Sequence, residues 1–392
     1  MKRSYYCRAV LVAALVSIPT ASFGQPGRAG ADVEALVKLG PRVAGTSVMK
    51  QASSYLVEEY RQAGYTTEIQ TFTYPKFEDL GSSLQVGGTT VKGLALRGTI
   101  ASKVNAPLVI VPNVGRTKDF AQVNVKGAIA IVRRGEIRFL EKAQNASSAG
   151  AIALVIVNSQ PGNLTGTLGG AAKIPVIALS GEQGNPLIDR AQKQQIQASL
   201  NVNARQRTVT GRNVVAHLPG VAQPQVLLGG HYDSVAGAPG ANDNASGTAV
   251  VLEIARRLSG TPQAGQTWFV AFDGEEDGLH GSRAFVKAAS PQFLSSLKAM
   301  LNFDMVGVNN TLGVGGTPEL AALAKNAKAS VSTFGSYGGS DHASFAAANV
   351  PVLFFYRGQE PNYHTPNDRQ VDSKLLDETA SVGLSVVKQL LM

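Results

Sequence analysis

The sequence predicts an α/β fold: a mainly parallel mixed sheet with helices on both faces, into which a small β-rich domain is inserted. Three observations support this prediction. Residues 211–392 alternate short apolar runs with helical patterns, which is typical of a parallel sheet covered on both faces. Residues 81–210 instead hold apolar runs separated by glycine, with one clear helical pattern. The same segment contains 15 Lys and Arg but 5 Asp and Glu, a net charge of +10 in a chain whose total is +9.

The composition fits a globular protein of two domains. The chain has 392 residues, of which 44% are hydrophobic and 42 are glycine, as expected for a large core with many turns. The basic segment shows neither interleaved aromatic residues nor a known nucleic-acid motif, so we interpret it as a solvated surface and expect no nucleic-acid partner.

The N-terminus has the pattern of a signal peptide over residues 1–24. Three basic residues lie within the first eight positions, an apolar run covers Ala9–Ile18, and Ser22–Gly24 offers small residues for cleavage. A run of about ten apolar residues is too short to cross a bilayer core of ~30 Å. We therefore expect a secreted or periplasmic protein that is not membrane-bound after cleavage. The only cysteine, Cys7, would be removed, so stability would depend on the core and on bound metal.

The segment after the signal peptide predicts two helices and a strand. Asp32 is placed to cap a first helix that ends before Pro41. A second helix is expected from Thr46 or Ser47 to Gly64, followed by a strand over Thr66–Tyr74. Together, residues 25–80 and 211–392 are predicted to form the larger domain, and residues 81–210 the inserted one.

Both domains have regular patterns further along the chain. In the inserted domain we expect strands over 108–111, 128–132, 151–157 and 174–179 and a helix over 137–148. In the larger domain we expect strands over 214–218, 226–230, 267–272, 300–304 and 352–356, and helices over 247–258, 282–289, 320–329, 341–348 and 373–391.

Five residues of the larger domain have the character of ligands for a pair of metal ions: His231, Asp243, Glu276, Asp304 and His364. Two imidazoles and three carboxylates suit zinc. One carboxylate that bridges two ions would leave each with two further protein ligands and an open position. His231, Glu276 and Asp304 lie at or just beyond predicted strand ends, where open α/β sheets bind their ligands.

The motifs around these residues resemble those of the zinc-dependent aminopeptidases of the Streptomyces and Aeromonas type, a family that also contains glutamate carboxypeptidase II and glutaminyl cyclase. Five motifs match in order: His231-Tyr-Asp, Asn242-Asp-Asn, Asp273-Gly-Glu-Glu, Asn302-Phe-Asp and Tyr363-His-Thr. The resemblance implies the phosphorylase/hydrolase-like fold of zinc exopeptidases. In the inserted segment, 127–135 and 174–177 are similar to the protease-associated domain, which is often inserted into exported peptidases.

The resemblance also implies a role for each residue. Asp243 would bridge two zinc ions, with His231 and Asp304 completing one site and Glu276 and His364 the other. Glu275 would be the general base that takes a proton from zinc-activated water. We therefore expect an exported di-zinc aminopeptidase that removes N-terminal residues from peptides.

Other residues would support the ligands or the substrate. Asp233 is placed to accept the second imidazole N–H of His231 and so fix its tautomer. By resemblance, Tyr363 would donate a hydrogen bond to the developing oxyanion, and the Asp243–Asn244 peptide bond would be cis. The segment containing Asp341 and His342 is similar to one near the family's specificity pocket; if it does not contact the substrate, we expect it to cap a helix.

Three alternatives stay open. A carboxypeptidase would need arginine for the substrate carboxylate, a role in which Arg357 could serve. A glutaminyl cyclase uses one zinc, whereas five ligand positions are present here. A metal-free, receptor-like binding protein on the same fold would need no ligand set. The sequence does not define the oligomeric state.

Overall fold

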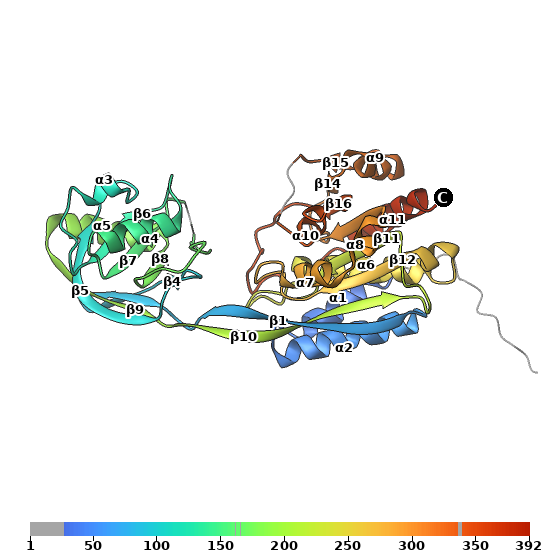
Figure 1. The fold of residues 1–392 in the computed structure, drawn as a ribbon, viewed down its shortest axis with the longest axis horizontal. Helices are drawn as coiled ribbons and strands as arrows, with labels where there is room; N and C mark the ends of the chain where they lie inside the picture. The colour runs from blue at the N-terminus through green and yellow to red at the C-terminus, as the bar shows by residue number, and fades with distance from the viewer. Residues whose placement is uncertain (1–26, 161, 165, 336–338) are drawn as a thin grey trace, which may run out of the picture. The chain divides into compact units, whose positions relative to one another are not determined.

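The computed structural model describes residues 27–160, 162–164, 166–335 and 339–392, which form two compact units (Figure 1). The first unit contains the described residues up to Phe72 together with Gly211–Met392, and the second contains Thr73–Thr210. The predicted signal peptide lies outside the described residues. In the part of the chain that is described, no helix combines the length and apolar character needed to cross a membrane.

A mixed eight-stranded sheet forms the centre of the first unit. Its middle four strands, β12, β11, β13 and β16, are parallel, and β10 and β14 pair antiparallel on either side of them. The carboxyl ends of the four parallel strands therefore meet at one edge. In order across the sheet the strands are β1 (Thr66–Asp79), β10 (Ala204–His217), β12 (Thr267–Phe272), β11 (Val226–His231), β13 (Ala299–Phe303), β16 (Val352–Tyr356), β14 (Gly313–Gly316) and β15 (Ser332–Thr333).

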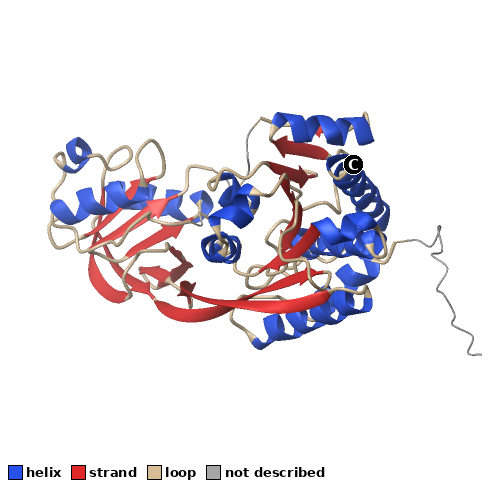
Figure 2. Cartoon of the chain, turned by 45° about the vertical axis from the view of Figure 1, so that its right-hand side comes forward, coloured by secondary structure: helices blue, strands red, loops and turns tan. Residues whose placement is uncertain are grey.

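Helices cover both faces of this sheet (Figure 2). Successive strand residues point to opposite faces, so Leu228 packs into one core and Leu227 into another, which also contains Phe285 and Phe345. The predicted layers are thus confirmed. On the face of Leu228 lie α1 (Ala29–Lys38), α2 (Ser47–Gln62), α6 (Gly247–Leu258), α9 (Pro318–Ala327) and α11 (Ser373–Leu390), and on the other α7 (His280–Ala288), α8 (Pro291–Ser295) and α10 (His342–Ala346).

Asp32 does not cap the first helix, because α1 already begins at Ala29. Its carboxylate is buried and accepts hydrogen bonds from the hydroxyl of Tyr55 at 2.6 Å and from both terminal nitrogens of Arg256 at 2.6 and 2.9 Å. Arg256 also donates to Glu59 at 2.7 Å. This buried ion-pair network joins α1, α2 and α6.

The second unit is built on another eight-stranded mixed sheet, with parallel pairing from β5 through β8. Its strands are, in sheet order, β3 (Thr89–Lys92), β2 (Ser83–Val86), β9 (Ile196–Val202), β5 (Ser102–Ile110), β6 (Ile129–Arg133), β7 (Ala153–Val157), β8 (Val176–Leu179) and β4 (Leu94–Ala95). The helices are α3 (Thr117–Phe120), α4 (Phe139–Ser148) and α5 (Gly181–Lys193).

The sequence prediction missed α5. Two glycines and Pro186 lower its helix propensity. The helix forms because Ser180 and Gln183 make a capping box at its start. Gly184 permits close packing on the sheet, since a Cβ atom there would lie 2.4 Å from Cγ1 of Val157. Tertiary packing therefore outweighs local propensity in this segment.

Candidate metal centre

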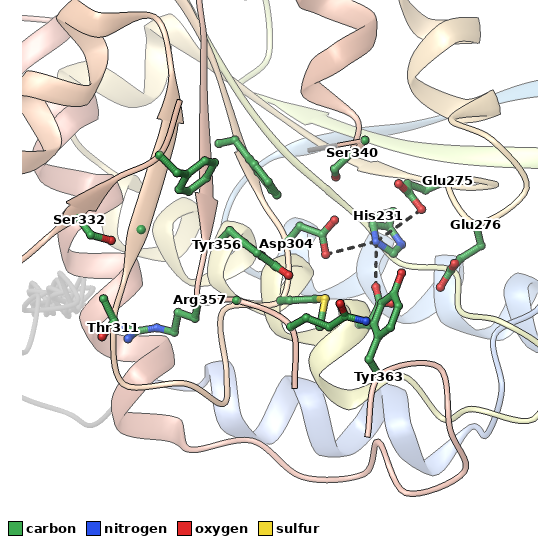
Figure 3. A pocket seen from close by; sticks show the side chains of 18 residues that line it. His231, Glu275, Glu276, Asp304, Thr311, Ser332, Ser340, Tyr356, Arg357 and Tyr363 are labelled. Atoms are coloured by element: carbon green, nitrogen blue, oxygen red, sulfur yellow. Dashed lines mark ion pairs between the residues drawn. The ribbon is translucent and has the colours of Figure 1, made fainter. Parts of the chain in front are cut away.

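The predicted ligands come together at the carboxyl edge of the first unit's sheet, where Figure 3 shows three of them, His231, Glu276 and Asp304. His231 ends β11, Glu276 lies in the turn after β12, and Asp304 directly follows β13. Asp243 lies in the turn over Ala241–Ser246 that precedes α6, and His364 lies in the loop between β16 and α11. Neighbouring parallel strands thus supply three of the side chains, as expected for an open α/β sheet.

The two imidazoles face different oxygens of Asp243. His231 Nε2 lies 3.3 Å from Asp243 Oδ1 and 3.5 Å from Asp304 Oδ1. His364 Nε2 lies 3.0 Å from Asp243 Oδ2 and 3.1 Å from Glu276 Oε2. Glu275 is more distant, with Oε2 3.9 Å from His231 Nε2. Asp243 therefore lies between the two imidazoles and contacts both.

The electrostatics of the cluster favour a bound cation. Burial and the surrounding carboxylates raise the pKa of Glu276 to about 7, and burial raises the pKa of Glu275 well above its usual value. Burial alone would lower the pKa of His364, but its hydrogen bonds to Asp243 and Glu276 raise it to about 10. Glu276 Oε1 is buried and has no hydrogen-bond partner among the described residues. Carboxylate and imidazole donors this close together suit zinc.

Asp233 supports the site in two ways. Its Oδ1 lies 3.4 Å from His231 Nδ1, whose other near contact is the Asp233 carbonyl oxygen at 3.3 Å. Its carboxylate also accepts the backbone N–H groups of Glu275 and Glu276, both at 3.2 Å. The sequence predicted the contact with His231 but not the bonds to the turn after β12, because backbone contacts leave no pattern in the sequence.

A cavity of about 610 Å³ opens beside the ligands. Glu275 and Tyr363 line it, and the ring of Tyr363 stacks on that of His364 with centroids 3.8 Å apart. Burial and the nearby carboxylates raise the pKa of Tyr363, so its phenol keeps a proton to donate. The peptide bond between Asp243 and Asn244 is cis, as the resemblance implied. An aromatic wall that the sequence did not indicate is formed by Phe334, Phe354 and Tyr356.

The residues suggested for substrate binding have other environments. Asp341 and His342 are buried and do not line the cavity, and His342 stacks behind Phe354 with centroids 4.4 Å apart. Asp341 makes no capping hydrogen bond to α10. Arg357 borders the cavity, but its guanidinium points away from the carboxylates and donates to the Asn309, Asn310 and Leu375 carbonyls (Figure 3). Asp341 and His342 therefore lie outside the cavity lining and Arg357 lies at its border, and a role of the three in substrate binding stays a prediction.

A sheet of this topology with an imidazole–carboxylate cluster at its carboxyl edge defines a class of metal-dependent hydrolase. The family model described as peptidase family M28 matches residues 213–387, and that of the PA domain matches residues 104–187. The chain is 33% identical over 366 residues to aminopeptidase YwaD of Bacillus subtilis strain 168, a match that covers 84% of this chain and 76% of that protein.

Two solved structures that resemble this chain are also aminopeptidases. An aminopeptidase from Aneurinibacillus sp. strain AM-1 has a TM-score of 0.79 and 32% identity, over 92% of this chain and 93% of that one. BSAP, a zinc aminopeptidase from Bacillus subtilis, has a TM-score of 0.78 and 29% identity, over 92% and 94%. The chain belongs to peptidase family M28 and carries a PA domain; it is a peptide hydrolase.

Proposed function

We propose that the chain is an exported aminopeptidase that holds two zinc ions bridged by Asp243. His231 and Asp304 would complete one site, and Glu276 and His364 the other. The observation that carries this proposal is the position of Asp243, whose two oxygens face separate imidazoles at 3.3 and 3.0 Å. The zinc aminopeptidase among the similar structures supports the choice of metal.

Bound zinc would polarise the scissile carbonyl and lower the pKa of an attacking water. Glu275 is the group that would then move the proton. Its carboxylate lines the cavity, and Asp233 holds its backbone amide. Glu275 Oε2 would accept a proton from water and deliver it to the leaving amine nitrogen. Burial raises the pKa of Glu275, which strengthens its carboxylate as a proton acceptor.

Tyr363 would stabilise the oxygen atom of the reacting carbonyl. Its hydroxyl faces the same cavity and stays protonated, so it can donate to the oxygen that becomes negative in the tetrahedral intermediate. Asp233 would hold the ring of His231 and, through the two amides, the orientation of the turn that bears Glu275 and Glu276.

The charges around the cavity favour an N-terminal over a C-terminal substrate. The carboxylates of Glu275, Glu276 and Asp304 that line it are the proposed base and zinc ligands, and no described lining residue offers a free cation for a substrate carboxylate. Among the described residues that line it, Arg357 carries a guanidinium, which is engaged by carbonyl oxygens and by Glu378 at 2.9 Å. A carboxypeptidase would need that arginine for its substrate, so an aminopeptidase is the better fit. The aromatic wall would accept an apolar side chain.

Metal content and substrate end-preference test the proposal together. Protein supplemented with zinc should contain close to two zinc ions per chain and cleave a free aminoacyl anilide. It should not cleave the N-acetylated anilide, which lacks the ammonium group. Zinc content near zero would contradict the di-zinc site and favour a receptor-like role. Cleavage of an N-acetylated peptide at its free C-terminus would favour a carboxypeptidase. One zinc ion per chain with cyclisation of N-terminal glutamine would favour a glutaminyl cyclase.

A further inference from the structure

The segment over 232–243 joins two of the proposed ligands, His231 and Asp243. It leaves the sheet at the end of β11 and returns to the core at α6. Two charged side chains from distant parts of the chain hold it, Arg42 and Asp368. Their relative exposures are 0% and 2%, so both charges are buried in the first unit.

Arg42 binds carbonyl oxygens at both ends of this segment. Its Nε donates to the Tyr232 carbonyl at 2.6 Å and its Nη2 to the Gly240 carbonyl at 2.8 Å, while Nη1 donates to the Pro239 carbonyl. Its backbone N–H also donates to Ser234 Oγ at 3.0 Å. A guanidinium presents its donors in a fixed planar fork, so one side chain can fix several carbonyls at once.

Asp368 binds the other side of the same turn. Its Oδ1 accepts the backbone N–H of Asn242 at 2.7 Å, and its Oδ2 accepts that of Asp243 at 3.0 Å. Its carbonyl oxygen accepts the N–H of Ala241 at 3.2 Å. Because Asp368 belongs to the loop of His364, these bonds tie one ligand-bearing loop to the other. Bonds from backbone N–H groups to a carboxylate are charge-assisted and therefore strong.

The turn is packed closely against these side chains at Gly240. Gly240 has φ +66°, and a Cβ atom there would lie 2.4 Å from the Asp243 carbonyl oxygen and 3.0 Å from Arg42 Nη2. Asp243 thus has little room to shift relative to Arg42. The Arg42 guanidinium binds carbonyl oxygens of this turn, and the Asp368 carboxylate binds its N–H groups. We call this pair of side chains the Arg42–Asp368 clamp.

We propose that Arg42 and Asp368 are positioning residues that fix the Asp243 carboxylate between His231 and His364, so that it can bridge two metal ions. This inference rests on the proposed di-zinc site. A bridging carboxylate must be held to within about 0.5 Å to serve two ions, and neither imidazole fixes the backbone that carries it. The clamp supplies that constraint from the backbone side.

Asp368→Asn tests the clamp with little change in volume. An amide can accept only one of the two N–H groups and directs a donor at the other. We expect the affinity for at least one zinc, measured by competition with a chelator, to fall roughly 10- to 100-fold. The matched control is Asp32→Asn, a carboxylate of 1% exposure held by Tyr55 and Arg256 in the α1–α2–α6 network. It should lower the melting temperature and keep zinc affinity within about twofold, because its carboxylate binds Tyr55 and Arg256 and no group of a ligand-bearing turn.

Arg42→Lys separates geometry from charge and provides a second variant. Lysine keeps the positive charge, but one ammonium cannot bridge Tyr232 and Gly240, so zinc affinity should again fall. Arg256→Lys is its control, because that arginine also makes several buried bonds without touching the ligand-bearing turns. The double variant Arg42→Lys/Asp368→Asn should lose less than the two single losses combined, because both act on one turn.

The outcomes separate the clamp from the proposed function. Wild-type protein with two zinc ions and unchanged affinity in both clamp variants would overturn the clamp alone. An equal loss of affinity in the Asp32→Asn and Arg256→Lys controls would also overturn it, because general loosening would then be the cause. Wild-type protein that binds no zinc would overturn the proposed di-zinc function and with it the clamp.

Discussion

Glu275 and Glu276 are neighbours in one turn, yet the structure predicts different results when each is substituted. Glu276 Oε2 lies 3.1 Å from His364 Nε2 and within the ligand cluster. Glu275 Oε2 lies 3.9 Å from His231 Nε2 and lines the open cavity. Asp233 holds the backbone amides of both residues, so a side-chain substitution at either position should leave the turn in place.

We expect Glu275→Gln to keep two zinc ions and to lose about 10²- to 10⁴-fold in kcat, the usual contribution of a general acid–base group. This loss corresponds to roughly 3–5 kcal/mol of transition-state stabilisation. KM should change little, because the substitution keeps the size of the side chain and removes only its capacity to accept a proton. Glu276→Gln, the matched control, should instead lose one zinc ion.

Steady-state hydrolysis of an aminoacyl anilide, with elemental analysis of the same samples, measures both quantities. The rival explanation is that Glu275 is itself a ligand, because its carboxylate also lies within reach of His231 and Asp304. That explanation predicts loss of zinc from Glu275→Gln. Either this loss or a near-wild-type kcat with both ions bound would refute the assignment of Glu275 as the base.

Three further predictions concern protons, stability and the second unit. The pKa of Glu276 is about 7 and that of His364 about 10, so zinc must displace a proton from each group when it binds. The affinity for zinc should therefore rise as the pH is raised from about 6 to 10. A pH-independent affinity in competition with a chelator would contradict this. Gly184→Ala should lower the free energy of unfolding by about 1–3 kcal/mol, because the added Cβ atom would clash with the Val157 side chain. We expect this loss although alanine has the better helix propensity. An unchanged melting temperature would show that α5 can shift to make room. Joining Phe72 to Gly211 through a short turn should leave a folded, zinc-binding first unit, because β1 and β10 are neighbours in its sheet; failure to fold would show that the second unit is needed for stability.

Much of the first unit could be predicted because its strands are short apolar runs between clear helical patterns. The prediction for β12 matches Thr267–Phe272 and that for β16 matches Val352–Tyr356, and α6 begins and ends as expected. In contrast, β14 consists largely of glycine, which disfavours strands, and forms because β16 offers a pairing edge. Local sequence does not contain that information.

The same distinction applies to the site. The ligand motifs could be recognised because each combines a ligand residue with a characteristic local context. Arg42 could not, because its partners are backbone carbonyls 190 or more positions further along the chain. Asp368 likewise binds backbone amides about 125 positions away. Every residue type has the carbonyl and every type except proline has the N–H, so the sequence of the partner segment gives no sign that a charged side chain binds it.

The origin of each proposed ligand explains why such contacts are needed. His231, Glu276 and Asp304 follow parallel strands, and the pairing of β11 with β12 and β13 fixes the points from which they project. Asp243 and His364 come from a turn and a loop, which vary in position unless they are tied to the rest of the structure. Asp368 supplies that tie for both, because it shares a loop with one and binds the backbone of the other. The sheet alone would therefore place three of the five proposed ligands, and the buried charges around the two loops would hold the other two.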